Sequence, residues 1–287
     1  MALSINLGKG KNKMCIINTS SVDTLYDSLD NAFGVNSGSV KAFLLCNLQK
    51  FINLGYWEID LKQLYEEFSL SEEFSLESIT IHHVTTRLGE VKQDSFTIDN
   101  LETVLLSENT LTQFLKKYKI EFKHEDGISV YYRGTLHKFK GYAEARLRNR
   151  LSNLRDSCVN GFLFAENMDN SYVGLTGMPE IYSDLMTSLN REDLQYKFFD
   201  EMKCYMATVK VSLSDFIFDD FSKIKDSSEK TKLILQYIFN YLCYKLSRNQ
   251  YYYFENPIVR LPDNANVGNS DILALRQITD YTEIFKK

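Results

Sequence analysis

The stretch SITIHHVTT, Ser78 to Thr86, decides the fold that this sequence predicts. It is short and rich in β-branched residues, which is typical of a β-strand. Successive side chains of a strand point to opposite faces, so His82 and His83 are expected on different sides of the sheet. The more apolar face is the one that carries Ile79, Ile81, His83 and Thr85.

Helical patterns precede this strand. Apolar side chains recur at helical spacing over residues 21–33, over residues 39–53 and after Asp60, and Ser20 or Ser21 suits the N-cap of the first helix. We therefore expect the first 70 residues to be wholly helical. The serine- and glutamate-rich segment SLSEEFSLE, Ser69 to Glu77, is the best boundary candidate. It separates a helical N-terminal region, residues 1–72, from an α+β body, residues 73–287.

The body is expected to be rich in strands with inserted helices. Short helices are predicted near residues 99–106 and 110–118. A three-stranded meander follows over residues 120–139, because Asp126-Gly127 and Arg133-Gly134 form turns between β-rich runs. Further helices are predicted at 142–155 and 229–248, and further strands at 159–164, 204–213, 251–261 and 272–278. Few regular βαβ spacings occur, which favours an α+β fold over a doubly wound sheet.

Composition excludes several classes of protein. The chain has 287 residues, of which 44% are hydrophobic and 13% aromatic, so a sizeable core can form. The formal net charge of −5 argues against a protein that coats nucleic acid. No apolar stretch has the length of a signal peptide or a membrane span, and the longest, Leu233 to Tyr244, is expected to be a core helix. The expected compartment is the cytoplasm, with no membrane partner.

Familiar catalytic and metal-binding motifs are absent from the sequence. It contains no Walker phosphate loop, GxGxxG, HExxH or GxSxG. The five cysteines are scattered, which indicates free thiols and neither a disulfide framework nor a zinc site. Adjacent His82 and His83 cannot share a metal ion from one strand, so we expect no metal.

Three separated residues remain as candidates: His83 in HHVTT, Tyr172 in SYVGL and Glu255 in YYYFENPIVRLP. A strand histidine followed by threonine, then a mid-chain tyrosine and a late-strand glutamate, resembles the His-Tyr-Glu pattern of the ADP-ribosyltransferase superfamily. The resemblance covers about residues 79–287. The chain has HVTT where many members have His-Gly-Thr or His-Gly-Ser.

The resemblance implies NAD⁺ as substrate, with loss of nicotinamide and attack of a nucleophile on the ribose carbon. His83, with the hydroxyl of Thr85 or Thr86, would hold the ribose, and Tyr172 would stack on the nicotinamide ring. Glu255 would accept a hydrogen bond from a ribose hydroxyl and stabilise the oxocarbenium-like charge, which needs a fixed carboxylate. The expected function is that of an ADP-ribosyltransferase or NAD glycohydrolase of a toxin or defence system, whose acceptor is an unidentified protein or nucleic acid. We expect the side chains of His83, Tyr172 and Glu255 to converge on one concave pocket.

Other readings stay open. His83 also fits a core histidine, Tyr172 is one of 18 tyrosines, and Glu255 fits a solvated carboxylate. The main alternative is a non-catalytic interaction module that binds a partner through the helices of residues 20–68, since tyrosine and phenylalanine also populate interfaces. A third alternative is contact with nucleic acid through the arginines of residues 146–155, although a solvated helix face is the simpler interpretation.

Overall fold

Two antiparallel strands of 11 residues each, β2 (Ser78–Leu88) and β7 (Met202–Ser212), form the centre of the fold. They pair along their whole length, from Ser78 opposite Ser212 to Leu88 opposite Met202. The computed structural model describes residues 16–54, 59–140, 144–152, 157–166, 168, 177–218, 224–247, 254–280 and 284. The expected α+β class is confirmed, with helices preceding a strand-rich body.

The main sheet has the order β10-β7-β2-β6-β9-β8, and β1 pairs with β2. Its other strands are β6 (Asn160–Phe162), β8 (Ile217–Phe218), β9 (Ile258–Arg260) and β10 (Ile272–Ile278). The strand β1 (Ile16–Ile17) runs parallel to the start of β2. The expectation that the first 70 residues are wholly helical is therefore wrong. Two apolar residues are too few to set a period, and only the distant partner strand makes them β.

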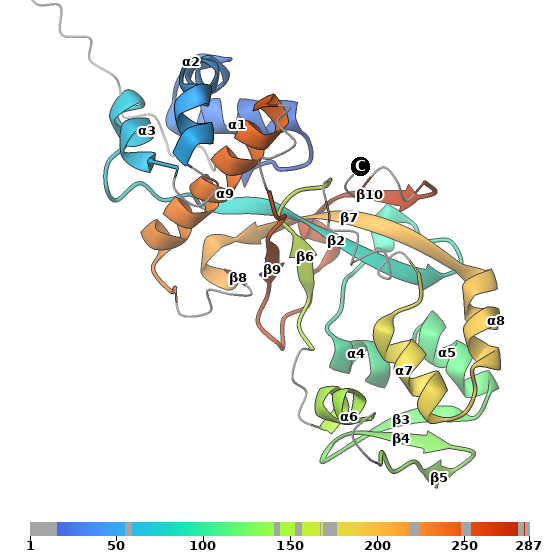
Figure 1. The fold of residues 1–287 in the computed structure, drawn as a ribbon. Helices are drawn as coiled ribbons and strands as arrows, with labels where there is room; N and C mark the ends of the chain where they lie inside the picture. The colour runs from blue at the N-terminus through green and yellow to red at the C-terminus, as the bar shows by residue number, and fades with distance from the viewer. Residues whose placement is uncertain are drawn as a thin grey trace, which may run out of the picture.

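The N-terminal helices pack on this sheet. They are α1 (Val22–Phe33), α2 (Ser39–Leu54) and α3 (Leu61–Glu67), as the apolar spacing predicts. Ser21 caps α1 in a reciprocal capping box, and Gly34 ends it in the left-handed region at φ 68°. The long helix α9 (Ser227–Ser247) joins them (Figure 1). One apolar core unites these helices with β2 and β7, so the expected division at residues 72–73 does not separate two cores.

A second lobe lies at the far ends of β2 and β7 (Figure 1). It contains α4 (Leu101–Leu106), α5 (Thr110–Lys117), α6 (Ala145–Ser152), α7 (Glu180–Ser188), α8 (Asp193–Glu201) and the meander β3 (Ile120–Glu125), β4 (Gly127–Tyr132), β5 (Thr135–Leu136). The meander is confirmed, with Arg133 and Gly134 both at positive φ in its second turn. The lobe has its own apolar core, with Phe114, Tyr182 and Phe198 in mutual ring contact. The sequence reading did not anticipate α7 and α8.

Three expectations from the composition concern the cysteines, membrane spans and metal ligands of the described residues. Cys46, Cys158, Cys204 and Cys243 are free thiols. Among these residues no helix combines the length and apolarity that a membrane span requires. Within the same part of the chain, no group of three metal-ligating side chains is assembled.

Candidate functional site

The candidate site lies where two halves of the main sheet meet. β2 and β6 are joined through one residue pair, His82 opposite Phe162. Figure 1 shows β6 and β9 running across the direction of β2 and β7. Beyond this pair, β2 continues through His83 to Leu88 with β7 along one edge. Beyond the pair, the edge of β2 that faces β6 has no strand partner among the described residues, and the His83 side chain is half-buried there.

Gly161 allows β6 to approach β2 this closely. A Cβ at residue 161 would lie 3.0 Å from the backbone oxygen of His82, 3.1 Å from its carbonyl carbon and 3.3 Å from the nitrogen of His83. Those atoms belong to the central strand and cannot turn aside as a flexible side chain would. Glycine is therefore required by close packing of two backbones.

The close approach places the carbonyl of Asn160 beside the His83 ring. Nδ1 of His83 lies 2.6 Å from that oxygen. A carbonyl only accepts, so Nδ1 carries the proton and Nε2 of the neutral ring is an acceptor. Nε2 makes no hydrogen bond to any other described residue. Burial lowers the pKa of His83 to about 4, reinforced by the positive charge of Arg87 and opposed by the Asn160 hydrogen bond.

His82 points to the opposite face and is fully buried. Its Nε2 lies 3.0 Å from Oγ1 of Thr19, and its Nδ1 lies 3.3 Å from Oγ1 of Thr208. Burial lowers its pKa to about 3. The opposite orientation of the two histidines is confirmed, but the more deeply buried ring is His82. Thr19 covers it from the segment between β1 and α1, a contact that no local pattern reveals.

Thr85 and Thr86 follow His83 on β2, and both are buried. Thr85 shares the face of His83, while Thr86 points to the other face, as the strand period requires. The Thr86 hydroxyl has no hydrogen-bond partner among the described residues. Thr85 is therefore the hydroxyl that accompanies His83.

Glu255 is exposed and lies three residues before β9. The next residue, Asn256, continues the ladder with its side chain: its Oδ1 accepts from the Phe164 nitrogen at 3.1 Å, and its Nδ2 donates to the Phe164 oxygen at 2.9 Å. Across β6, His83 is level with Val259.

Tyr172 lies outside the described residues. The expected convergence of the three side chains therefore stays a prediction.

Glu166 is a carboxylate that the sequence analysis missed. It accepts a hydrogen bond from the Tyr241 hydroxyl at 2.6 Å and an ion pair from Lys245 at 3.0 Å. Burial alone would raise the pKa of Glu166, but these two contacts lower it overall. Its backbone oxygen also accepts from Nδ2 of Asn256 at 3.0 Å, so it lies in the same corner of the sheet as Glu255. Its partners are 75 or more residues away, and no short motif records them.

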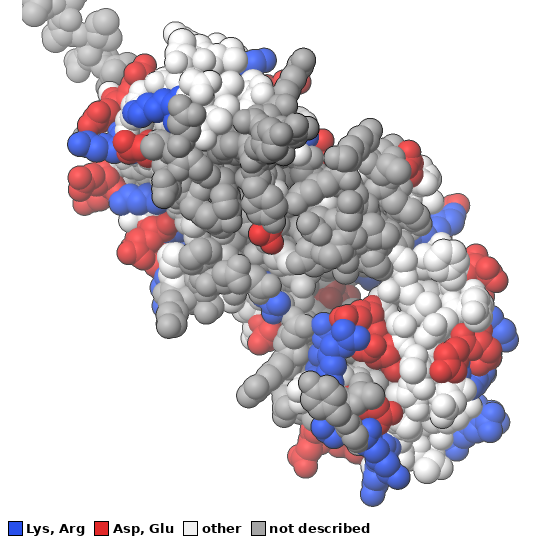
Figure 2. Space-filling model, viewed as in Figure 1, with Lys and Arg blue, Asp and Glu red and all other residues white. Residues whose placement is uncertain are grey.

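Two of the arginines of α6 pair with acids of α7. Arg146 pairs with Glu180 and, at 2.7 Å, with Asp184, while Arg150 pairs with Glu180 at 2.8 Å. Figure 2 shows basic and acidic side chains interspersed over the described part of the face in view. This arrangement is that of a solvated, ion-paired helix face.

Comparison of the chain with protein-family models, curated proteins and solved structures finds no match in any of the three.

Proposed function

We propose that the chain is an NAD⁺-consuming enzyme, either an ADP-ribosyltransferase or an NAD glycohydrolase, with His83 in the nucleotide site. One observation carries the proposal: the hydrogen bond from Nδ1 of His83 to the Asn160 carbonyl leaves Nε2 as an acceptor at the sheet junction. A ribose offers hydroxyl donors that such an atom binds. Because the pKa of His83 is about 4, the ring stays an acceptor at neutral pH.

In the proposed reaction the bond between nicotinamide and the ribose carbon breaks, and nicotinamide leaves with the bonding electron pair. Water or the hydroxyl, amide or other nucleophile of an acceptor then bonds to that carbon and loses a proton. Glu255 stabilises the positive charge that builds on the ribose, and Tyr172 stacks on the nicotinamide ring. Thr85 supports the ribose beside His83.

We also propose a physiological setting for this chemistry. NAD⁺ chemistry of this type suits a toxin or defence protein acting in the cytoplasm, where free thiols such as those of Cys204 and Cys243 persist. The acceptor in a transfer reaction would be a protein or a nucleic acid.

The test is nicotinamide release from NAD⁺, followed by chromatography with and without candidate acceptors. His83→Ala should abolish most of the release, since it removes the acceptor atom. His124→Ala is the matched control, because the His124 side chain is 63% exposed on the second lobe. Equal release by the parent and both variants would remove His83 from the site. Complete absence of release from the parent would reject the enzymatic proposal.

A second candidate function is partner binding through residues 20–68. It is favoured by Leu45 of α2, which is 55% exposed next to the exposed Cys46. A single exposed leucine is ordinary at a protein surface, so this candidate stays second to the enzymatic one. If the parent self-associates in light scattering and Leu45→Lys does not, this candidate gains support. A parent that stays monomeric and captures no partner would count against it.

A further inference from the structure

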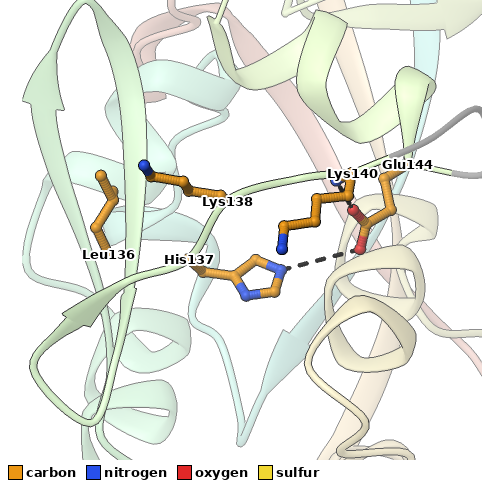
Figure 3. Close-up of a pocket in the computed structure, with 5 residues that line it drawn as sticks. All are labelled: Leu136, His137, Lys138, Lys140 and Glu144. Carbon is orange, nitrogen blue, oxygen red and sulfur yellow. Dashed lines mark hydrogen bonds and ion pairs between the residues drawn. The ribbon is translucent and has the colours of Figure 1, made fainter.

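A hollow in the second lobe has the size of a small-molecule site. It is lined by Leu136, His137, Lys138, Lys140 and Glu144, and its volume is about 460 Å³ (Figure 3). Small-molecule sites in proteins commonly have volumes of about 300 to 1,000 Å³. The hollow follows the meander strand β5 and lies away from the sheet junction of His83, so it is independent of the proposed function.

The carboxylate of Glu144 is hydrogen-bonded to neighbouring groups of the hollow. Its carboxylate accepts hydrogen bonds from the Ser188 hydroxyl and from the backbone nitrogen of Lys140. These bonds, with the Ser188 bond as the largest cause, lower the pKa of Glu144. Since the Ser188 hydroxyl donates its hydrogen bond to Glu144, the Ser188 oxygen accepts a hydrogen bond from Nε2 of His137, 2.8 Å away. Nε2 of His137 also lies 3.9 Å from the Glu144 carboxylate.

The ammonium groups of the two lysines differ from the Glu144 carboxylate in this respect. No carboxylate of the described residues lies within ion-pair distance of the ammonium group of Lys138 or Lys140. Figure 3 shows Lys138 extending toward Leu136 and Lys140 extending toward His137, so both bend back along the segment that carries them. In the same lobe Arg146, Arg150 and Arg191 are each paired with a carboxylate. The two ammonium groups are therefore available to an external anion.

We propose that this hollow binds a small ligand through a phosphate group. Both lysines line the hollow, and two ammonium groups match a group that carries more than one negative charge and several acceptor oxygens. His137 belongs to the wall, because its Nε2 donates to Ser188, and its ring reports on a ligand that enters beside it. Leu136, 40% exposed, offers an apolar surface to the remainder of the ligand. Four of the five lining residues are charged or polar, which favours a charged ligand over an apolar one.

The test uses pyrophosphate as the probe, with binding measured by titration calorimetry at low ionic strength. The double variant Lys138→Gln/Lys140→Gln should bind about tenfold more weakly or worse, because both charge-assisted contacts are lost. The double variant Lys116→Gln/Lys117→Gln makes the same change of net charge on exposed lysines of α5, and it should bind like the parent.

An independent measurement needs no variant. In protein labelled with ¹⁵N-histidine, pyrophosphate should shift the resonances of His137 and leave those of the exposed His124 in place. Equal weakening in both double variants would show general attraction to positive charge and overturn the proposal. Absence of calorimetric binding together with an unmoved His137 resonance would overturn it too.

Discussion

Gly161→Ala is the substitution that tests the sheet junction most directly. The added methyl group would lie 3.0 Å from the His82 oxygen, where ordinary contacts of such a carbon begin at 3.4 Å. The surrounding atoms are backbone atoms of the central strand, so β6 must retreat by a few tenths of an ångström. Forcing one extra carbon into a packed site costs typically about 1 to 3 kcal/mol. The loss of glycine freedom in the unfolded chain returns about 0.4 to 1 kcal/mol. The expected net change is a destabilisation of about 1 to 2 kcal/mol.

The assay is urea unfolding at equilibrium, combined with ¹⁵N spectra of the histidines. Retreat of β6 lengthens the 2.6 Å contact between Nδ1 of His83 and the Asn160 oxygen, so the Nδ1–H tautomer of His83 should lose population. Gly268→Ala is the control, because its added carbon meets only Oγ of Ser270 at 3.8 Å. If Gly161→Ala unfolds at the urea midpoint of the parent and keeps the His83 spectrum, the close packing of β6 on β2 is not what fixes this histidine.

Three further predictions concern acid stability, charge and a buried lysine. Because the pKa values of His82 and His83 fall from 6.5 to about 3 and about 4 on folding, the unfolded chain binds more protons below pH 6.5. The free energy of unfolding should therefore decrease as the pH is lowered from about 6.5 to 4, by up to about 1.4 kcal/mol per pH unit for each histidine. Urea midpoints that stay constant over this range would contradict the prediction. Glu255→Gln should melt like the parent yet lower nicotinamide release by about 10² to 10³-fold, and full activity in this variant would make Glu255 a surface carboxylate. Lys230→Met should destabilise the protein by about 2 to 3 kcal/mol. The reason is that Nζ of the buried Lys230 donates to the carbonyls of Leu213 and Phe216 at 2.8 Å each. An unchanged melting temperature would refute this prediction.

Local patterns predicted the elements whose signals are local. The helix α1 combines apolar spacing with the Ser21 cap and Gly34, and the meander combines β-rich runs with turns at Gly127 and Gly134. β1 escaped prediction because its two residues become a strand only by pairing with Ser78 and Ile79. The helices α7 and α8 were missed although Leu185 and Phe198 anchor them in the core of the second lobe. The signal for α7 was present, since Ile181, Tyr182, Leu185, Met186 and Leu189 repeat at helical spacing, and it was overlooked.

In the candidate site, too, local signals were predicted and contacts between distant residues were not. The strand period placed His83 and Thr85 on one face, and the structure agrees. The tautomer of His83 depends on the Asn160 carbonyl, 77 residues away, and on the close approach at Gly161. The pairing of Glu166 with Tyr241 and Lys245 is equally remote in sequence. Contacts of this range follow from tertiary packing and leave no local periodicity to detect.

Binding of NAD⁺ at His83 can be observed without relying on turnover. The chain has four histidines, His82, His83, His124 and His137, so ¹⁵N-histidine spectra resolve each ring. Without ligand, Nε2 of His83 should resonate as an unprotonated nitrogen at neutral pH. On addition of NAD⁺ that signal should move in the direction expected for a nitrogen that accepts a hydrogen bond, while the signals of the buried His82 and the exposed His124 stay in place. A His83 signal that NAD⁺ leaves unchanged at saturating concentration would contradict the proposed nucleotide site.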